Sequence, residues 1–218
     1  MPDRPLLLGH RGARATRSVP ENTIASFDLA LAHGCDGFEF DLRSSKDAAA
    51  ILCHDAKLGK LEIARAMRSE LPQLASLENV VERYRDRAFL DLELKVPGLQ
   101  ETVLTVLEQY VPQRGFVISS FFPEILLQSH ARNSAIPLGF IADRRELLNR
   151  WKEFPIEWVI VNYRLATKKL IEEVHGEGKK ACIWTVNEAD AMRRFADWGA
   201  DAIISDETEL LVSTLRVR

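Results

Sequence analysis

Charged and histidine side chains gather at the ends of short apolar segments in the first half of the sequence, where a buried strand does not normally carry them. The clusters combine carboxylates, imidazoles and cationic side chains. Such a set suits the binding of a divalent cation and proton transfer on an anionic substrate. Strand ends later in the chain carry fewer such residues. The clusters are His10-Arg11-Gly12, Glu39-Phe40-Asp41, His54-Asp55 and Asp91-Leu92-Glu93-Leu94-Lys95.

The spacing within two of these clusters places their charges on one face of a strand. Glu39 and Asp41 lie two positions apart. So do Asp91, Glu93 and Lys95. Residues i and i+2 share a strand face, so each set points to one side and its apolar neighbours to the other. A single Glu-x-Asp is usually a solvated edge, but the apolar flanks here argue against one. Buried charges must then be paired or coordinate an ion, and all-oxygen ligands favour Ca2+ or Mg2+ over zinc.

The elements that must position these residues alternate along the whole chain. Short apolar runs followed by amphipathic stretches are typical of a parallel sheet with helical crossovers. About eight such units predict a single (β/α)8 TIM barrel rather than an open doubly wound sheet, and neither GxGxxG after the first strand nor a Walker motif is present. The expected strands are Leu6–Gly9, Gly37–Leu42, Ala49–Cys53, Ala88–Lys95, Phe116–Ser120, Pro137–Ile141, Glu157–Val161, Lys180–Thr185 and Ala202–Ser205. The expected helices start near Pro20 and Ser76 or span Leu99–Tyr110, Pro123–Ala131, Arg144–Phe154, Thr167–Gly178, Glu188–Trp198 and Glu207–Leu215.

The composition excludes several classes of protein. The chain has 218 residues, of which 46% are apolar and 28% are charged, and its formal net charge is −3. This balance is typical of a folded domain and argues against a disordered chain or a basic nucleic-acid binder. The three cysteines form no CxxC, which argues against a zinc ribbon or a disulfide framework. The apolar run at the N-terminus is short, so we expect one cytoplasmic domain over residues 1–218 with no stable membrane anchor.

In combination, these residues resemble the glycerophosphodiester phosphodiesterase family. The resemblance runs from His10 to about Ser205, and the ordered combination is specific although each piece alone is not. It implies a (β/α)8 barrel that hydrolyses small-molecule glycerophosphodiesters to glycerol 3-phosphate and an alcohol. The matching pieces are His10-Arg11-Gly12, Pro20-Glu21-Asn22-Thr23, Glu39-Phe40-Asp41, His54-Asp55, Glu93-Leu94-Lys95, Ser119-Ser120-Phe121 and Trp184-Thr185-Val186-Asn187.

The resemblance also implies roles for eight residues in three groups. They are the metal ligands Glu39, Asp41 and Glu93, the catalytic histidines His10 and His54, and the substrate-binding residues Arg11, Lys95 and Trp184. The metal ligands would hold one divalent cation, Mg2+ or Ca2+. Histidine suits proton transfer because its unperturbed pKa of about 6.5 lies near neutrality. The sequence leaves open which histidine is the acid, whether water or the glycerol 2-hydroxyl attacks first, which alcohol is released and how the chain oligomerises.

The segment after His54-Asp55 departs from the family pattern. Relatives usually continue with Leu-x-Arg-Thr-Thr-x-Gly and a small helical insertion over the site, whereas Ala56–Glu62 has no Thr-Thr. We therefore expect a reduced insertion after the second βα region and a more open pocket. The alternative is that residues 57–75 form an equivalent but divergent cap.

Two features beside the clusters have roles that the family pattern does not assign. We expect Asp91 to orient Lys95 or a metal ligand. The basic loop Ala13–Val19 either contacts the substrate headgroup or is simply solvated.

Two other functions compete with this interpretation. A lysophospholipase-D-like hydrolase would need a long apolar groove for an acyl chain, and no exposed apolar stretch indicates one. A non-catalytic binder of polyol phosphates would need the loss of a central residue, yet all five central positions are present, namely His10, Glu39, Asp41, His54 and Glu93.

Overall fold

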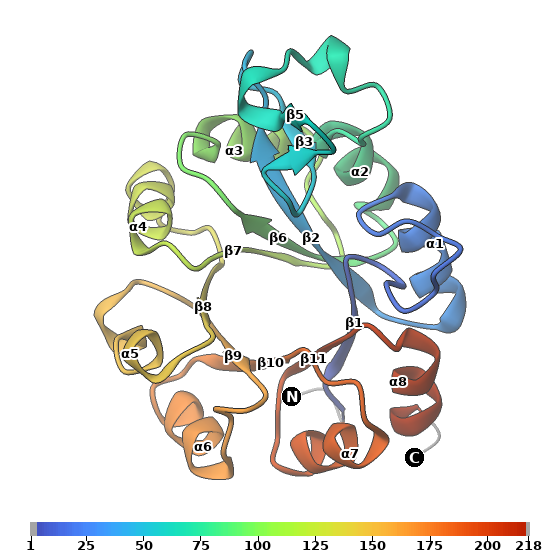
Figure 1. Cartoon of the computed structure of the whole chain (residues 1–218). Helices are drawn as coiled ribbons and strands as arrows, with labels where there is room; N and C mark the ends of the chain where they lie inside the picture. Colours follow the sequence, from blue (N-terminus) through green and yellow to red (C-terminus); the bar gives the residue numbers. More distant parts are fainter. Residues whose placement is uncertain (1–3, 217–218) are drawn as a thin grey trace.

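The computed structural model describes residues 4–216, and its centre is a closed ring of eight parallel strands (Figure 1). The ring closes because β1 pairs with both β2 and β11. Neighbours around the ring are also successive in the sequence, which confirms the predicted (β/α)8 barrel. The strands are β1 (Leu6–His10), β2 (Gly37–Ser44), β6 (Phe89–Leu94), β7 (Phe116–Ser120), β8 (Leu138–Ala142), β9 (Trp158–Asn162), β10 (Lys180–Trp184) and β11 (Ala202–Ser205).

Helices surround the ring and connect successive strands (Figure 1). The first begins at Ile24, because the Thr23 hydroxyl accepts a hydrogen bond from the Ser26 amide and caps it. No helix within residues 4–216 combines the length and the apolar character that a bilayer crossing requires. The helices are α1 (Ile24–His33), α2 (Leu77–Tyr84), α3 (Gln100–Gln109), α4 (Pro123–Arg132), α5 (Arg145–Leu148), α6 (Lys168–Gly176), α7 (Ala189–Asp197) and α8 (Thr208–Leu215).

One expected helix is wrong. The segment predicted as a continuous helix over Arg144–Phe154 consists of the four-residue α5 and a separate 3-10 turn over Trp151–Glu153. Trp151 is 3% exposed and Phe154 is 7% exposed, so the tight turn buries both rings without a continuous helix. The apolar spacing indicated burial correctly, but burial does not require an unbroken run of helical hydrogen bonds.

Alternation along the strands divides the apolar residues into two layers. Phe38, Phe40 and Leu92 point outward into the layer between strands and helices, where the rings of Phe27 and Phe38 stack with centroids 4.1 Å apart. A second, smaller cluster fills the inside of the barrel. Its members come from seven strands, and they are Leu8, Phe89, Val117, Ile141, Trp158, Ile160, Cys182, Ala202 and Ile204. This inner cluster packs inside the barrel beneath the polar residues at the carboxyl ends of the strands.

The segment between β2 and α2 is a small folded unit beside the barrel. It starts with β3, which extends β2 in antiparallel pairing, and continues through a two-stranded hairpin and two 3-10 turns. Figure 1 places it, in cyan, at the edge of the ring next to α2 and α3. Its elements are β3 (Ala50–Leu52), β4 (Lys57–Leu58), β5 (Leu61–Glu62) and the turns Ile63–Arg65 and Arg68–Glu70. Its own apolar cluster holds it together, and that cluster consists of Ile51, Cys53, Ile63, Ala66 and Leu71.

Candidate active site

The strand register brings the predicted clusters to one end of the barrel. His10 of β1 is level with Glu39 of β2, and Glu39 is level with Asp91 of β6. Two residues further along the strands, Asp41 is level with Glu93. These inward-facing positions lie towards the carboxyl ends of the strands, which is the end where (β/α)8 barrels carry their sites.

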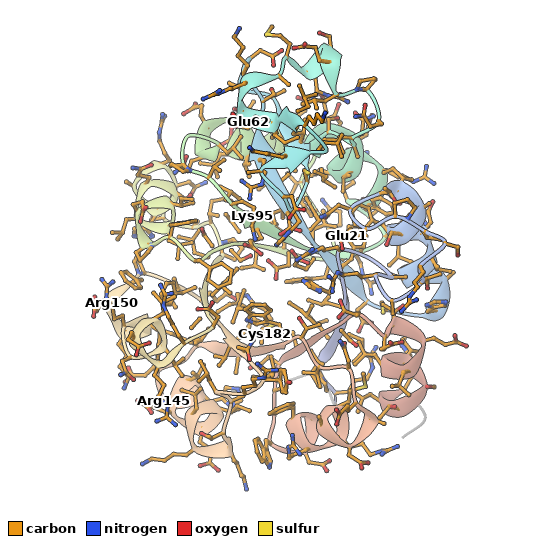
Figure 2. All side chains as sticks on the ribbon, in the orientation of Figure 1. Glu21, Glu62, Lys95, Arg145, Arg150 and Cys182 are labelled. Carbon is orange, nitrogen blue, oxygen red and sulfur yellow. The ribbon has the colours of Figure 1, made fainter. Side chains whose placement is uncertain are left out.

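A cavity of about 110 Å3 lies inside this end of the barrel. Asp41 does not line it but contacts two side chains that do, Arg11 and Lys95. Figure 2 shows Lys95 among the side chains within the ring of strands. No residue between 55 and 75 is part of the wall of this cavity. The predicted site residues that line the cavity are His10, Arg11, Glu39, His54, Glu93, Lys95 and Trp184.

Three carboxylates converge at the cavity and are not balanced by the protein alone. Oxygens of Glu39, Asp41 and Glu93 lie within 4.8 Å of one another, and all three residues are buried. Glu39 Oε1 has no hydrogen-bond partner in the described part of the chain. Burial, and then the nearby charge of Asp41, raise the pKa of Glu93 to about 7 and that of Glu39 well above its usual value. Carboxylates so placed fit a hard divalent cation, which would satisfy the free oxygen and favour the ionised forms.

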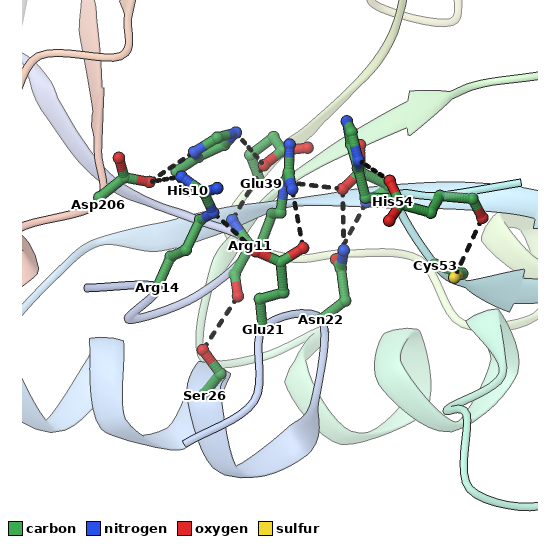
Figure 3. Close-up of polar contacts among 12 residues, drawn as sticks. His10, Arg11, Arg14, Glu21, Asn22, Ser26, Glu39, Cys53, His54 and Asp206 are labelled. Atoms are coloured by element: carbon green, nitrogen blue, oxygen red, sulfur yellow. Dashed lines mark hydrogen bonds and ion pairs between the residues drawn. The ribbon is translucent and has the colours of Figure 1, made fainter. Parts of the chain in front are cut away.

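Asp41 is the carboxylate of this triad that the protein itself keeps ionised. Burial acts to raise its pKa, but two cations and a hydrogen bond outweigh that effect and hold the pKa below its usual value. Its carboxylate lies 3.1 Å from Arg11 Nε and 3.3 Å from Lys95 Nζ. Asn22 Nδ2 donates a hydrogen bond of 2.8 Å to the same group, as Figure 3 shows.

The His-Arg-Gly sequence turns the chain sharply so that Arg11 can face the carboxylates. Arg11 has a φ of 53°, and its backbone N–H donates to Glu39 Oε2 at 3.0 Å. The next residue must be glycine, because its φ is 83° and a Cβ there would lie 2.4 Å from Ser26 Oγ. Arg11 Nη1 also donates to Glu21 Oε1 at 2.8 Å. The turn therefore fixes a guanidinium at the rim of the cavity.

Lys95 supplies the second cation from the end of β6. Its Nζ lies 2.7 Å from Glu93 Oε1 and bridges that carboxylate to Asp41. Burial opposes its charge, but the two carboxylates outweigh this and raise the pKa of Lys95. The same ammonium lies 5.8 Å from the ring centre of Phe121, which stands edge-on to the ring of Trp184. Trp184 thereby lines the cavity on its apolar side.

His10 is held by a carboxylate from the far end of the sequence (Figure 3). Its Nδ1 lies 2.7 Å from Asp206 Oδ1, while its Nε2 lies 3.9 Å from Glu39 Oε2. Asp206 in turn accepts hydrogen bonds from Asn187 Nδ2 at 2.7 Å and Arg14 Nη1 at 3.1 Å. Burial lowers the pKa of His10, although the Asp206 carboxylate opposes that effect. The neutral imidazole is thus oriented with Nδ1 outward and Nε2 toward the triad.

His54 occupies a more open position on the other side of the cavity. Its side chain is 36% exposed, against 12% for His10. Its Nδ1 lies 2.8 Å from Asp55 Oδ1, and its backbone carbonyl accepts a hydrogen bond from Arg43 Nε. The two imidazoles therefore reach the same cavity from different segments of the chain and in different environments.

The sequence analysis missed the residues that orient the site residues without lining the cavity themselves. Asp206 directly follows β11, so the same search for polar residues after strands could have found it. Asn22 lies within the Pro-Glu-Asn-Thr piece, which was interpreted as a helix start and as part of the family resemblance without a role for Asn22. Asn187 ends the last piece of the resemblance, but its hydrogen bond to Asp206 depends on packing between two strand ends.

The structure gives contacts for two features beside the clusters whose roles were left open. Asp91 lies two same-face positions before Lys95 on β6 and accepts a 2.5 Å hydrogen bond from Ser119 Oγ, whereas Lys95 contacts Asp41 and Glu93. The alternative, that Asp91 orients a metal ligand, stays a prediction. Burial raises the pKa of Asp91 to about 7. The loop Ala13–Val19 is tied to the site through Arg14, which binds Glu21 and Asp206. Arg14 therefore helps to hold Asp206, the carboxylate that orients His10. Neither alternative for this loop included that role.

Comparison with known proteins finds matches to one family over nearly the whole chain. The model of the Glycerophosphoryl diester phosphodiesterase family matches residues 10–103 and 85–210. A glycerophosphodiester phosphodiesterase of Caldanaerobacter subterraneus subsp. tengcongensis is 25% identical over 242 residues, which cover 97% of this chain and 98% of that protein.

Solved structures agree with this match. A glycerophosphodiester phosphodiesterase from Thermotoga maritima has a TM-score of 0.84 and 25% identity, with 98% of each chain covered. A phosphodiesterase from Oleispira antarctica, solved in complex with the product sn-glycerol-3-phosphate, has a TM-score of 0.84 and 24% identity. That alignment covers 97% of this chain and 96% of the Oleispira chain, so the two share the whole fold.

Proposed function

The chain belongs to the glycerophosphoryl diester phosphodiesterase family and is an enzyme of that family, and on this premise we propose that it hydrolyses glycerophosphodiesters to glycerol 3-phosphate and an alcohol with the help of a divalent cation. The observation that carries the proposal is the buried triad of Glu39, Asp41 and Glu93, with a free carboxylate oxygen facing a cavity that two cations and two imidazoles also reach. The product bound to the Oleispira antarctica phosphodiesterase supports the assignment of glycerol 3-phosphate as the product.

The triad would hold one Mg2+ or Ca2+ through carboxylate oxygens. When bound, such a cation neutralises phosphoryl oxygens and lowers the pKa of a hydroxyl or water next to it. Arg11 and Lys95 add positive charge at the rim, and both are already oriented by the carboxylates they contact. They would stabilise negative charge on the phosphoryl oxygens as it develops.

The two imidazoles would transfer the protons. One accepts the proton of the attacking hydroxyl or water, and the other donates a proton to the oxygen of the departing alcohol. The Asp206 carboxylate keeps the His10 proton on Nδ1 in the neutral ring, which leaves Nε2 free on the cavity side. Each such proton transfer contributes roughly 10²–10⁴ in rate.

A coupled assay for glycerol 3-phosphate tests the proposal. The protein would be treated with EDTA and supplied with glycerophosphocholine, glycerophosphoethanolamine or glycerophosphoglycerol, with Mg2+ or Ca2+ added back. We expect release only after a cation is restored. Folded protein that releases no glycerol 3-phosphate with any cation or substrate would refute the activity. Release that continues unchanged in EDTA would refute the requirement for a divalent cation.

A further inference from the structure

The central cavity is too small for a whole glycerophosphodiester. Its volume is about 110 Å3, whereas pockets for small ligands usually measure about 300–1,000 Å3. Part of the substrate must therefore lie outside the cavity. This inference rests on the proposed function, because it concerns the portion of the same diester that the cavity leaves uncovered.

A second hollow of about 370 Å3 is lined by the loops that follow the carboxyl ends of two barrel strands, so it lies at the same end of the barrel as the cavity. It lies between the loop after β9, the loop after β10 and helix α7, and these two strands are neighbours in the ring (Figure 1). Trp184 lines the central cavity and the next residue, Thr185, lines the hollow. Asn187 also lines the hollow and hydrogen-bonds Asp206, which holds His10. The hollow is thus linked to the His10 side of the cavity through Trp184–Thr185 and through the Asn187–Asp206–His10 hydrogen bonds.

Two arginines give this hollow its charge. Arg164 stacks on the ring of Tyr163 with its guanidinium carbon 5.5 Å from the ring centre, and its Nε donates to the Tyr163 hydroxyl at 3.2 Å. Arg194 lies 5.1 Å from the ring centre of Phe195. Neither guanidinium forms an ion pair with a carboxylate anywhere in residues 4–216, so both keep donors free for a ligand. One acidic side chain, Glu188, lines the same hollow, which leaves its charge positive.

The hollow on the opposite side of the mouth has a different character. It measures about 310 Å3, and apart from Arg43 and Ser44 its wall consists of Ala56, Ile63, Ala64, Val96 and Pro97. Arg43 there already donates to the carbonyl of His54. An ionised group would gain little in that apolar hollow, whereas two free guanidinium groups can form charge-assisted hydrogen bonds with a carboxylate or a phosphate.

We propose that the hollow formed by the β9 and β10 loops and α7 binds the alcohol portion of the glycerophosphodiester, and that it favours alcohols carrying a carboxylate or a second phosphate. An alcohol that carries only an ammonium group meets two like charges there. An aromatic face can attract an ammonium group, but the Tyr163 ring is already covered by Arg164. Selectivity therefore comes from Arg164 and Arg194, and Glu188 reduces it.

A matched pair of substrates tests this selectivity directly. Glycerophosphoserine differs from glycerophosphoethanolamine by one carboxylate, so the ratio of their kcat/KM values measures what that carboxylate gains. We expect a ratio of about ten or more in the unaltered protein, which corresponds to about 1.4 kcal/mol. The double variant Arg164→Gln/Arg194→Gln should bring the ratio close to one by lowering kcat/KM for glycerophosphoserine. Glu188→Gln should raise the ratio.

The control is Arg114→Gln, which removes an exposed arginine from the loop before β7, at the opposite end of the barrel. It should leave the ratio unchanged. Normal turnover of both substrates at a ratio near one, or a high ratio that the double variant retains, would refute the subsite and leave the proposed function intact. Absence of turnover with every glycerophosphodiester would refute the proposed function, and the subsite with it.

Discussion

Replacing Asp206 with asparagine tests whether this carboxylate determines how His10 works. The Nδ1–Oδ1 distance is 2.7 Å, so the carboxylate both fixes the ring tautomer and stabilises the imidazolium form. A hydrogen bond to a charged group is worth about 1.5–3 kcal/mol, which corresponds to a rate loss of about 10–150-fold if it acts only in the transition state. Asparagine can also donate to Nδ1 and favour the wrong tautomer. We therefore expect Asp206→Asn to lower kcat by about 10²–10³ while KM changes by less than about threefold.

The chain contains a matched control for this substitution at the other end of β11. Asp201 precedes β11 as Asp206 follows it, and its Oδ2 lies 2.8 Å from His175 Nε2. This second carboxylate–histidine pair is at the far end of the barrel from the cavity. Asp201→Asn should lower the melting temperature and leave kcat unchanged. Steady-state kinetics and thermal unfolding of both variants decide the question. The reasoning is wrong if Asp206→Asn retains kcat within about threefold, or if Asp201→Asn loses as much.

Three further substitutions and one binding measurement extend the test. His54→Ala should reduce kcat by about 10²–10⁴ in folded protein, measured by the glycerol 3-phosphate assay. Glu39→Gln should abolish calorimetric Mg2+ or Ca2+ binding and raise the melting temperature of metal-free protein by about 2–4 °C, because it removes a buried, poorly compensated charge. The pKa of Asp36 is lowered, because its hydrogen bonds and ion pairs, chiefly with Arg4, outweigh the effect of burial. The contribution of Asp36 to stability is therefore present above the unfolded pKa of about 3.9 and is lost as pH falls. Asp36→Asn should cost about 1–3 kcal/mol at pH 7 and less at pH 3 in denaturant titrations. Calorimetry should also find glycerol 3-phosphate binding at least tenfold weaker without a divalent cation. Unchanged kcat, retained metal binding, a pH-independent loss or equal affinities, respectively, would contradict these expectations.

Much of the fold and of the inner wall of the site could be predicted because strand geometry is local. A period of two assigns Glu39 and Asp41 to one face and Phe40 to the other, whatever the rest of the chain does. Parallel strands that alternate with helices then bring their carboxyl ends to one edge. The sequence thus predicted the side chains of Glu39 and Glu93 that line the cavity, and that of Asp41, which contacts the wall from behind Arg11 and Lys95.

Contacts between residues distant in the sequence could not be predicted in the same way. Asp206 is 196 positions from His10, and nothing in either neighbourhood indicates their contact. The partner of Asp91 depends on the register between strands, because Ser119 of β7 is level with Glu93 and its hydroxyl still donates to Asp91. Register and depth result from the closed ring as a whole, so they become visible only when all eight strands are in place.

The charges around the cavity explain why a cation and a phosphodiester belong to the same site. Three carboxylates face two cations, Arg11 and Lys95, which leaves one negative charge uncompensated when all five groups are ionised. The raised pKa values of Glu39 and Glu93 reflect the cost of that imbalance in a buried place. A phosphodiester monoanion would be repelled by this site, whereas a divalent cation on the triad would remove the excess negative charge. Arg11 and Lys95 alone would bind phosphate but could not position a metal ion. The triad alone would bind a metal ion but could not retain the substrate. Catalysis on a phosphodiester therefore requires both sets of charges side by side.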